Sequence, residues 1–182
     1  MATVNWTEQT DEQLSWHWEH HVRPRLEGLT DEEYLWEPVP GCWSLRPGPD
    51  GGPWTADYTF PEPDPAPVTT IAWRIGHVIV GVFGERTASH FGGPPISYET
   101  HRWAPTAAEA LAQLDDAYAA WIKGVRSLDA EALARPCGPA EGPFAEYPMA
   151  ALVLHINREA IHHMAEVLLL RDLYRSRPTP LT

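Results

Sequence analysis

The hydrophobic positions of this chain repeat at helical spacing in several long segments. In the first, large apolar side chains recur every four residues at Leu14, Trp18, Val22 and Leu26. We predict a helix over residues 10–28, with Thr10 and Gln13 forming a capping box at its start. Pro24 lies inside this pattern, so we expect a kink or an early end there.

The second segment is apolar on nearly every side, which is typical of a buried helix. It begins at residue 69 or 70, after Pro67, and runs to about residue 91, where Gly92 follows. The short stretch 78–80 also fits a strand. The total length and the start and stop signals favour a helix.

Two more helices follow prolines. Thr106 and Glu109 form a capping box ahead of a predicted helix over 107–125. The last helix begins near Pro148 and runs to about residue 175. No segment shows sustained period-two alternation. The predicted fold class is therefore all-α, a four-helix bundle that forms one domain over residues 1–182.

A proline-rich segment separates the first two helices. Nine of the nineteen prolines lie between residues 38 and 67. The segment also contains Trp43 and Trp54, whereas disordered segments are poor in aromatic residues. We predict an ordered flap over one end of the bundle, with Trp43 and Trp54 as candidates for substrate contact.

Composition excludes some classes of partner. The formal net charge is −12 and Lys123 is the single lysine, so no basic surface for nucleic acid or an anionic membrane is expected. No apolar run is long enough to span a membrane, and the N-terminus lacks the pattern of a secretory signal. We expect a cytoplasmic protein in which Cys42 and Cys137 stay reduced.

Candidate metal ligands lie on two of the predicted helices. His155, Glu159 and His163 are spaced by four, which places them on one stripe. Two adjacent members of this stripe can bind one metal ion, whereas its two ends lie about 12 Å apart along the helix axis. His77 lies in the apolar second helix, where its ring nitrogens need a partner. From the residues alone, that partner is either a metal held from the facing helix or a carbonyl or carboxylate.

This layout resembles the DinB-like superfamily, in particular the branch that contains mycothiol-dependent maleylpyruvate isomerase and related thiol transferases. The resemblance rests on residues 23–32 with 36–38, residues 70–77 and residues 155–172. In that branch a helix-two histidine, a helix-four glutamate and a histidine four residues later bind a divalent metal. The matching positions here are His77, Glu159 and His163.

One departure from the family concerns the residues after His163. Many relatives have glycine followed by glutamine or histidine there, and this chain has Met164, Ala165 and Glu166. The departure does not affect the three ligand positions, but it does not allow the chain to be assigned to a specific subfamily.

The resemblance implies a metal with three protein ligands and open positions for water or substrate. Zinc suits two histidines and a carboxylate, and nickel, iron and manganese stay open. Expected neighbours of the ligands are His155, Asn157 and Arg158. The residues do not identify catalytic groups.

The implied function is transfer or isomerisation with a low-molecular-weight thiol such as mycothiol, acting on a small electrophile. A metal-dependent hydrolase and a small-molecule-sequestering protein are the alternatives. We also expect a homodimer.

Overall fold

The computed structural model describes residues 4–59 and 61–178, and most of these residues lie in helices. The helical elements are α1 (Trp6–His17), η1 (Trp18–Val22), α2 (Arg23–Arg25), α3 (Asp31–Tyr34), η2 (Pro49–Gly51), α4 (Ile71–His77), η3 (Val78–Gly84), α5 (Glu85–Phe91), α6 (Ala107–Arg126), α7 (Ala130–Ala134), η4 (Pro139–Phe144) and α8 (Met149–Ser176). Two short strands, β1 (Leu45–Arg46) and β2 (Thr55–Ala56), pair antiparallel. The helical content confirms the predicted all-α class. The two-residue strands are too short to show alternation in sequence.

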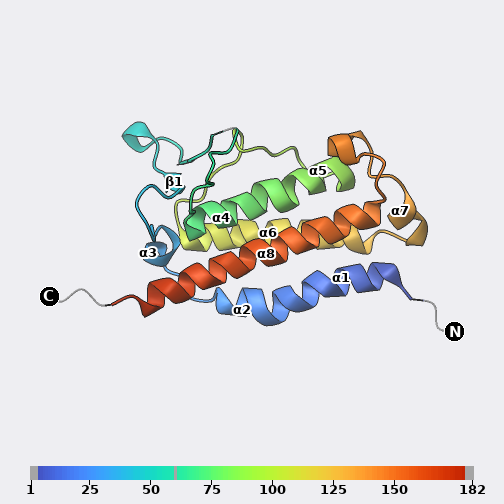
Figure 1. Cartoon of the computed structure of the whole chain (residues 1–182), viewed down its shortest axis with the longest axis horizontal. Helices are drawn as coiled ribbons and strands as arrows, with labels where there is room; N and C mark the ends of the chain where they lie inside the picture. The colour runs from blue at the N-terminus through green and yellow to red at the C-terminus, as the bar shows by residue number, and fades with distance from the viewer. Residues whose placement is uncertain (1–3, 60, 179–182) are drawn as a thin grey trace.

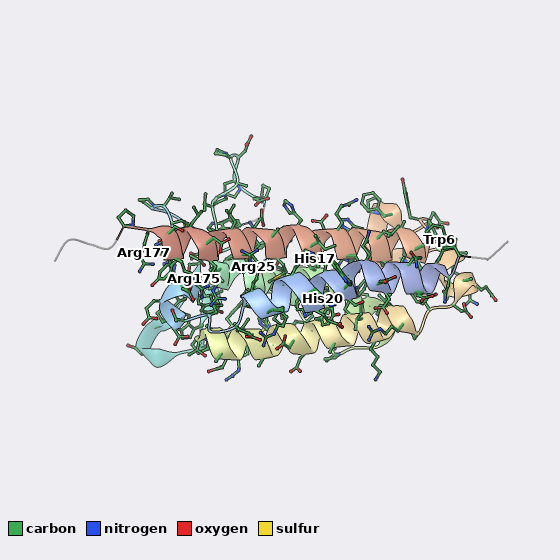
Figure 2. The ribbon with its side chains drawn as sticks, turned by 90° about the horizontal axis from the view of Figure 1, so that it is seen from below. Trp6, His17, His20, Arg25, Arg175 and Arg177 are labelled. Carbon is green, nitrogen blue, oxygen red and sulfur yellow. The ribbon has the colours of Figure 1, made fainter. Side chains whose placement is uncertain are left out.

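The long helices lie side by side with nearly aligned axes (Figure 1). α1, η1 and α2 follow one another in a continuous helical run, as do α4, η3 and α5. α1 packs against both α6 and α8, and α4 packs against the same two helices. Seen from below, α1 lies between α8 and α6 (Figure 2). Each long helix can therefore bury an apolar face against two neighbours.

The first helix begins earlier than predicted. The side chain of Asn5 accepts a hydrogen bond from the backbone N–H of Glu8, so α1 begins at Trp6. The predicted cap at Thr10 is wrong, because this residue lies inside the helix and its hydroxyl donates to the carbonyl of Trp6 at 2.9 Å. Threonine can either cap a helix or bond back to the preceding turn, and the sequence does not distinguish the two.

The early end expected at Pro24 is confirmed. Proline has no N–H to donate to the preceding turn. The turn before it, η1, is π-helical, and the helical run ends with Arg25 rather than at Gly28. Gly28 itself adopts a φ of 64°, a left-handed conformation that glycine tolerates best.

The other predicted helix bounds are confirmed within one or two residues. The hydroxyl of Thr70 accepts from the N–H of Trp73 and caps α4, and the run ends at Gly92 with φ 74°. Helix α6 is capped in the same way by Thr106, and α8 follows Pro148. The strand alternative for residues 78–80 is wrong, since they lie in η3. Within the described residues, no helix is both long and apolar enough to cross a membrane.

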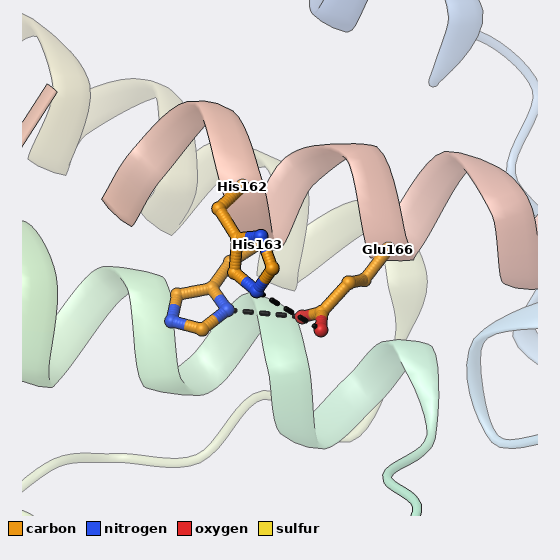
Figure 3. Close-up of side chains that lie close together, drawn as sticks. All are labelled: His162, His163 and Glu166. Carbon is orange, nitrogen blue, oxygen red and sulfur yellow. Dashed lines mark hydrogen bonds and ion pairs between the residues drawn. The ribbon is translucent and has the colours of Figure 1, made fainter. Parts of the chain in front are cut away.

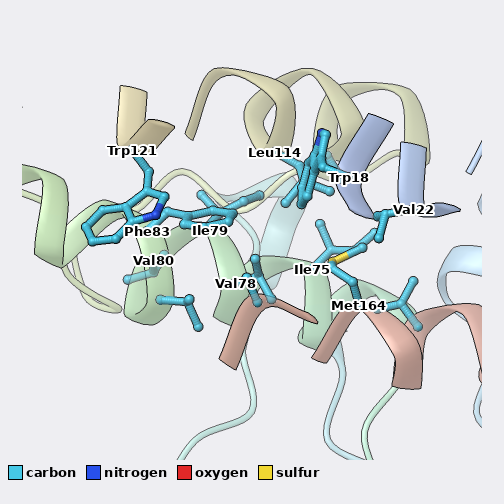
Figure 4. Packing of buried hydrophobic residues seen from close by; sticks show 14 of the residues in the cluster. Trp18, Val22, Ile75, Val78, Ile79, Val80, Phe83, Leu114, Trp121 and Met164 are labelled. Atoms are coloured by element: carbon cyan, nitrogen blue, oxygen red, sulfur yellow. The ribbon is translucent and has the colours of Figure 1, made fainter. Parts of the chain in front are cut away.

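The core lies along the middle of the packed helices (Figure 4). Every long helix contributes fully buried apolar side chains, among them Val22, Ile75, Phe83, Leu114, Trp121 and Met164. Burying one such side chain stabilises the fold by about 1.5–3 kcal/mol. The apolar faces of α4 and η3 take part in this core, and they fix the face of α4 that meets α8.

A buried ion pair fixes the position of α8 near its C-terminal end. Glu33 and Arg171 have side chains only 4% and 2% exposed, and Arg171 Nε lies 3.3 Å from Glu33 Oε1. Arg175 adds a second contact to the same oxygen at 2.7 Å. Arg171 also donates to the backbone carbonyls of Arg25 and Glu27. This network joins the end of the first helix and α3 to α8.

The proline-rich segment is attached to the start of α4. The backbone N–H of Trp43 donates to the carbonyl of Val68, and the N–H of Thr70 donates to the carbonyl of Trp43, both at 2.9 Å. The indole N–H of Trp73 donates to the carbonyl of Asp57 at 2.6 Å. Residue 60 lies outside the described residues. These bonds hold the described parts of the segment against α4.

Candidate metal centre

Two histidines from facing helices meet between α4 and α8. His77 is the last residue of α4 and His163 lies in α8. Their ring centroids are 4.8 Å apart and the ring planes are nearly perpendicular, at 84°. The indole of Trp73 stacks on the other side of His77, at 5.4 Å and 10°. The structure thus brings together two of the sequence-predicted ligands.

Each of these imidazoles has its Nδ1 nitrogen held by a neighbour. The Nδ1 of His163 lies 2.9 Å from Oε2 of Glu166, and because a carboxylate only accepts, this nitrogen carries the proton. The Nδ1 of His77 is hydrogen-bonded to the hydroxyl of Tyr98 at 2.5 Å. Contacts of this kind fix the orientation of a metal-binding histidine. The Nε2 nitrogens are left as the candidate ligand atoms.

Burial keeps both rings neutral at pH 7. Burial, together with smaller contributions from the nearby His163 and Arg74, lowers the pKa of His77 to about 3. Burial also lowers the pKa of His163 below its ordinary value. A neutral imidazole has the free lone pair that a metal requires. The donor chemistry of this pair therefore fits a metal ion.

Glu159 lies beside His163 but shares its carboxylate among several neighbours. Its Oε2 is 3.7 Å from Nε2 of His163. Its Oε1 is 3.5 Å from His155 Nδ1 and 3.5 Å from Arg158 Nε. His155 and Arg158, expected as neighbours of the ligands, thus do contact Glu159, and both are exposed.

A second cluster shares His163. His162, His163 and Glu166 offer ligand atoms within 4.8 Å of one another and could hold a metal ion (Figure 3). Across residues 4–59 and 61–178, no other group of three histidine, cysteine or acidic residues is this compact. His162 is not among the ligands predicted from the sequence, and Glu166 is noted there only as a departure from the family. The spacing of Glu166, three residues after His163, was the available signal.

Asn157 was wrongly expected beside the ligands. It is fully buried, and its amide donates to the carbonyl of Thr10 at 2.7 Å. Its side-chain oxygen accepts from the indole of Trp121 at 3.2 Å. Asn157 therefore faces α1 and α6, and it joins three helices in the core.

The two tryptophans of the proline-rich segment have different neighbours. Trp43 lies 5.4 Å from Trp73, which stacks on His77, so a short row of rings joins the proline-rich segment to the candidate site. Trp54 packs against the hydrophobic core. Trp43 is therefore connected to His77 through the ring of Trp73, whereas Trp54 contacts the core.

Tyr98 and Gly81 are two further residues of the site that the sequence does not predict. Tyr98 comes from the loop between α5 and α6, where no periodic pattern marks it. Gly81 lies one turn after His77, and a β-carbon there would come within 2.8 Å of the Tyr98 hydroxyl and 3.3 Å of the His77 ring. Glycine at this position makes room for the hydrogen bond between Tyr98 and His77.

Comparison with known proteins gives one family. A family model described as the DinB superfamily matches residues 13–167, from α1 to α8. This range includes all three sequence-predicted ligands. Searches of curated proteins and of solved structures return no match. Because the matched range covers most of the chain, the protein belongs to the DinB superfamily.

Proposed function

We propose that this protein is a metal-dependent enzyme that transfers a low-molecular-weight thiol, such as mycothiol, to a small electrophilic substrate. Release of the thiol with rearrangement would make it an isomerase, and retention would make it a transferase. His77, Glu159 and His163 hold the metal in this proposal. The observation that carries it is the pair of imidazoles whose ring centroids are 4.8 Å apart, with an oxygen of Glu159 3.7 Å from Nε2 of His163.

Glu166 fits a supporting role better than a ligand role. Its Oε2 already accepts from His163 Nδ1 and lies 3.0 Å from Arg74 Nε. These two contacts occupy Oε2, and the positive charge of Arg74 offsets that of the carboxylate, while Oε1 lies 3.4 Å from Nε2 of His162. His162 has a side chain 63% exposed to solvent, whereas that of His163 is only 12% exposed. A metal shared by His77, Glu159 and His163 would lie between two helices and be better shielded from water.

The ligand set suits several divalent ions. Two imidazoles and one carboxylate bind zinc, and the same set accepts nickel, iron or manganese. We propose zinc first. Closing this site requires Glu159 to turn its carboxylate toward His77, away from His155 and Arg158.

The chain's own residues supply binding and orientation. A bound divalent ion lowers the pKa of a thiol and favours the thiolate, which is the nucleophilic form of sulfur. Tyr98 and Glu166 hold the two imidazoles by their Nδ1 nitrogens, which leaves both Nε2 nitrogens for a metal. Trp73 covers one side of His77 and limits access of water to it.

The first experiment measures metal in the untagged protein by mass spectrometry. Wild type should carry about one ion per chain and His163→Ala should carry little. The His163→Ala variant should also lose conjugation of thiols to 1-chloro-2,4-dinitrobenzene. Retention of metal and of full activity in this variant would overturn the proposal. Turnover of ester substrates without any thiol would favour the hydrolase alternative.

We further propose that the four long helices form a four-helix bundle of the DinB type, that the proline-rich segment covers one end of it, and that two copies pair. The face formed by α1 and α8 leaves large apolar side chains exposed, namely Trp6, Trp16, Leu154, Leu169 and Leu173. In a chain of net charge −12, the same side of the molecule carries His17, His20, Arg25, Arg175 and Arg177 (Figure 2). Arg25 and Arg175 there are already paired with Asp172 and Glu33, so the exposed apolar side chains are the reason to expect pairing through this face.

A further inference from the structure

Three histidines lie close together on the first helix, away from the candidate metal centre (Figure 2). His17 is the last residue of α1, and His20 and His21 lie in the next turn, η1. His17 and His21 line a hollow of about 330 Å³, and Ala165 of α8 lies in its opposite wall. Ala165 comes two residues after His163, which turns it about 200° around the helix. A ligand in this hollow is therefore separate from one held by His163.

The rings of His17 and His21 are spaced as two ligands of one metal ion are. Their centroids are 5.5 Å apart, and their planes are 29° from parallel. Two imidazoles that bind one tetrahedral ion at about 2.0–2.1 Å have ring centroids about 5 Å apart. A spacing of four residues brings any two side chains of a helix near each other, so the distance alone does not indicate a site. The surroundings of the two rings supply the further evidence.

One nitrogen of this pair is buried without a hydrogen-bond partner. Nε2 of His17 is shielded from solvent, and no partner for it is present among residues 4–59 and 61–178. Buried polar atoms in proteins almost always have a partner. The neighbouring His20 differs, because its Nδ1 lies 2.9 Å from the carbonyl oxygen of Trp16. His17 therefore has a ring nitrogen that still needs a partner.

The charges in the hollow are compatible with a bound cation. Burial and, to a smaller extent, the nearby His21 lower the pKa of His17 below its ordinary value of 6.5. The ring is therefore neutral at pH 7, and one of its nitrogens has a free lone pair. The two charged residues that line the hollow, Arg25 and Asp172, are paired with each other at 2.6 Å. They leave the hollow without a net positive charge that would repel a metal ion.

We propose that His17 and His21 form a second metal site, a two-histidine chelate for a divalent late transition metal ion. Imidazole nitrogens suit copper, nickel and zinc, and copper binds most tightly among these ions. In this proposal His17 turns Nε2 away from α8 and into the hollow, where the ion supplies the missing partner. The ring of Trp16 lies 4.9 Å from that of His21 and limits its movement. Water completes the coordination of the ion.

An ion at this site would act on the first helix. It would link the last residue of α1 to the π-helical turn that follows it. The two rings are brought together by the folded helix, so the ion binds the folded chain in preference to the unfolded one. Binding of this kind stabilises the fold and raises its melting temperature.

The test removes the candidate metal centre first. The untagged His162→Ala/His163→Ala chain lacks a ligand of each cluster described above, and titration calorimetry should show that it still binds Cu²⁺. Electron paramagnetic resonance should show two nitrogen ligands on the bound copper. His21→Ala in this background should weaken Cu²⁺ binding at least about tenfold, since even loss of a residue that only supports a ligand has this effect. His20→Ala is the matched control, because this exposed histidine lies in the same turn, and it should bind Cu²⁺ as the background does.

The outcomes decide the inference independently of the proposed enzyme, whose ligand His163 is already absent from the background. Equal Cu²⁺ affinity with and without His21 would overturn the inference, and so would equal losses in the His20 and His21 variants. A rise in melting temperature with Cu²⁺ that disappears in His21→Ala and persists in His20→Ala would support it.

Discussion

The Nδ1 nitrogen of His163 lies 2.9 Å from Oε2 of Glu166, one turn further along the same helix. Arg74 of α4 lies 3.0 Å from the same oxygen. Glu166 thus orients a proposed ligand, and Arg74 joins it to the facing helix. Glu166 leaves Nε2 of His163 as the nitrogen that faces Glu159.

Replacing Glu166 with glutamine should weaken metal binding without abolishing it. The amide can still meet His163, but it loses the charge that holds the Nδ1 proton and raises the basicity of the ring. Loss of such a partner typically reduces metal affinity about 10- to 100-fold. Competition for zinc with a chromophoric chelator measures the change.

His162→Ala is the control that separates the two possible clusters. If the metal is held by His77, Glu159 and His163, the variant should bind zinc nearly as wild type, and His77→Ala should lose it. The opposite pattern, with loss in His162→Ala and retention in His77→Ala, would assign the metal to His162, His163 and Glu166.

Gly81→Ala should disturb the candidate site more than the fold. The new β-carbon would come within 2.8 Å of the Tyr98 hydroxyl, so the tyrosine must move away from His77. Alanine is favoured over glycine in a helix by about 1 kcal/mol, which offsets part of the steric cost. We expect a melting temperature close to wild type and zinc affinity reduced several-fold, as in Tyr98→Phe. Unchanged affinity in both variants would show that the contact between Tyr98 and His77 is dispensable.

Glu33→Gln should destabilise the protein and change its response to acid. Removing one partner of a buried ion pair costs about 3–5 kcal/mol. Burial raises the pKa of Glu33, but hydrogen bonds from Thr30, Arg175 and Arg171 outweigh it, so the pKa lies below the ordinary value of 4.5. The stability that Glu33 contributes is therefore present above pH 4.5 and is lost as the pH falls through its lowered pKa.

Urea unfolding of wild type and Glu33→Gln at several pH values checks this prediction. The gap in unfolding free energy should be largest near neutral pH and narrow steadily below pH 4.5. If the difference in unfolding free energy between the two proteins stayed constant down to pH 3, the pKa of Glu33 would be the same in the folded and unfolded states, which contradicts the prediction.

Leu169→Glu should separate the proposed dimer. Leu169 is 59% exposed on α8, and a carboxylate there would have to be buried between two chains. Light scattering after size exclusion should give twice the 20.4 kDa chain mass for wild type and the single mass for the variant. Val39→Glu, a similarly exposed position outside α1 and α8, should remain dimeric. A monomeric wild type would contradict the dimer.

The helix bounds were largely predictable because local chemistry fixes them. Thr70, Thr106 and Gly92 mark helix ends through single hydrogen bonds or one backbone angle, and these signals are present in the sequence. The start of α1 was missed because Thr10 can act in two ways. Inside the helix, the carbonyl of Thr10 accepts a hydrogen bond from Asn157 of α8, which lies 147 residues away in the sequence.

The candidate site was only partly predictable. Helical spacing identified the stripe of His155, Glu159 and His163, but spacing could not say which helix faces it. The contact of His77 with that stripe was implied by family resemblance rather than by the residues. Tyr98 lies in the loop between α5 and α6, and its hydrogen bond to His77 depends on how this loop packs against α4. Such contacts follow from the fold and leave no periodic signal.

Trp73 contacts both the proline-rich segment and the candidate metal centre. Its N–H is bonded to Asp57 in the proline-rich segment, and its ring lies flat on His77. Indole emission responds to both hydrogen bonding and ring contacts. The protein therefore contains a natural fluorophore whose signal should change when either the segment lifts or the histidine is engaged.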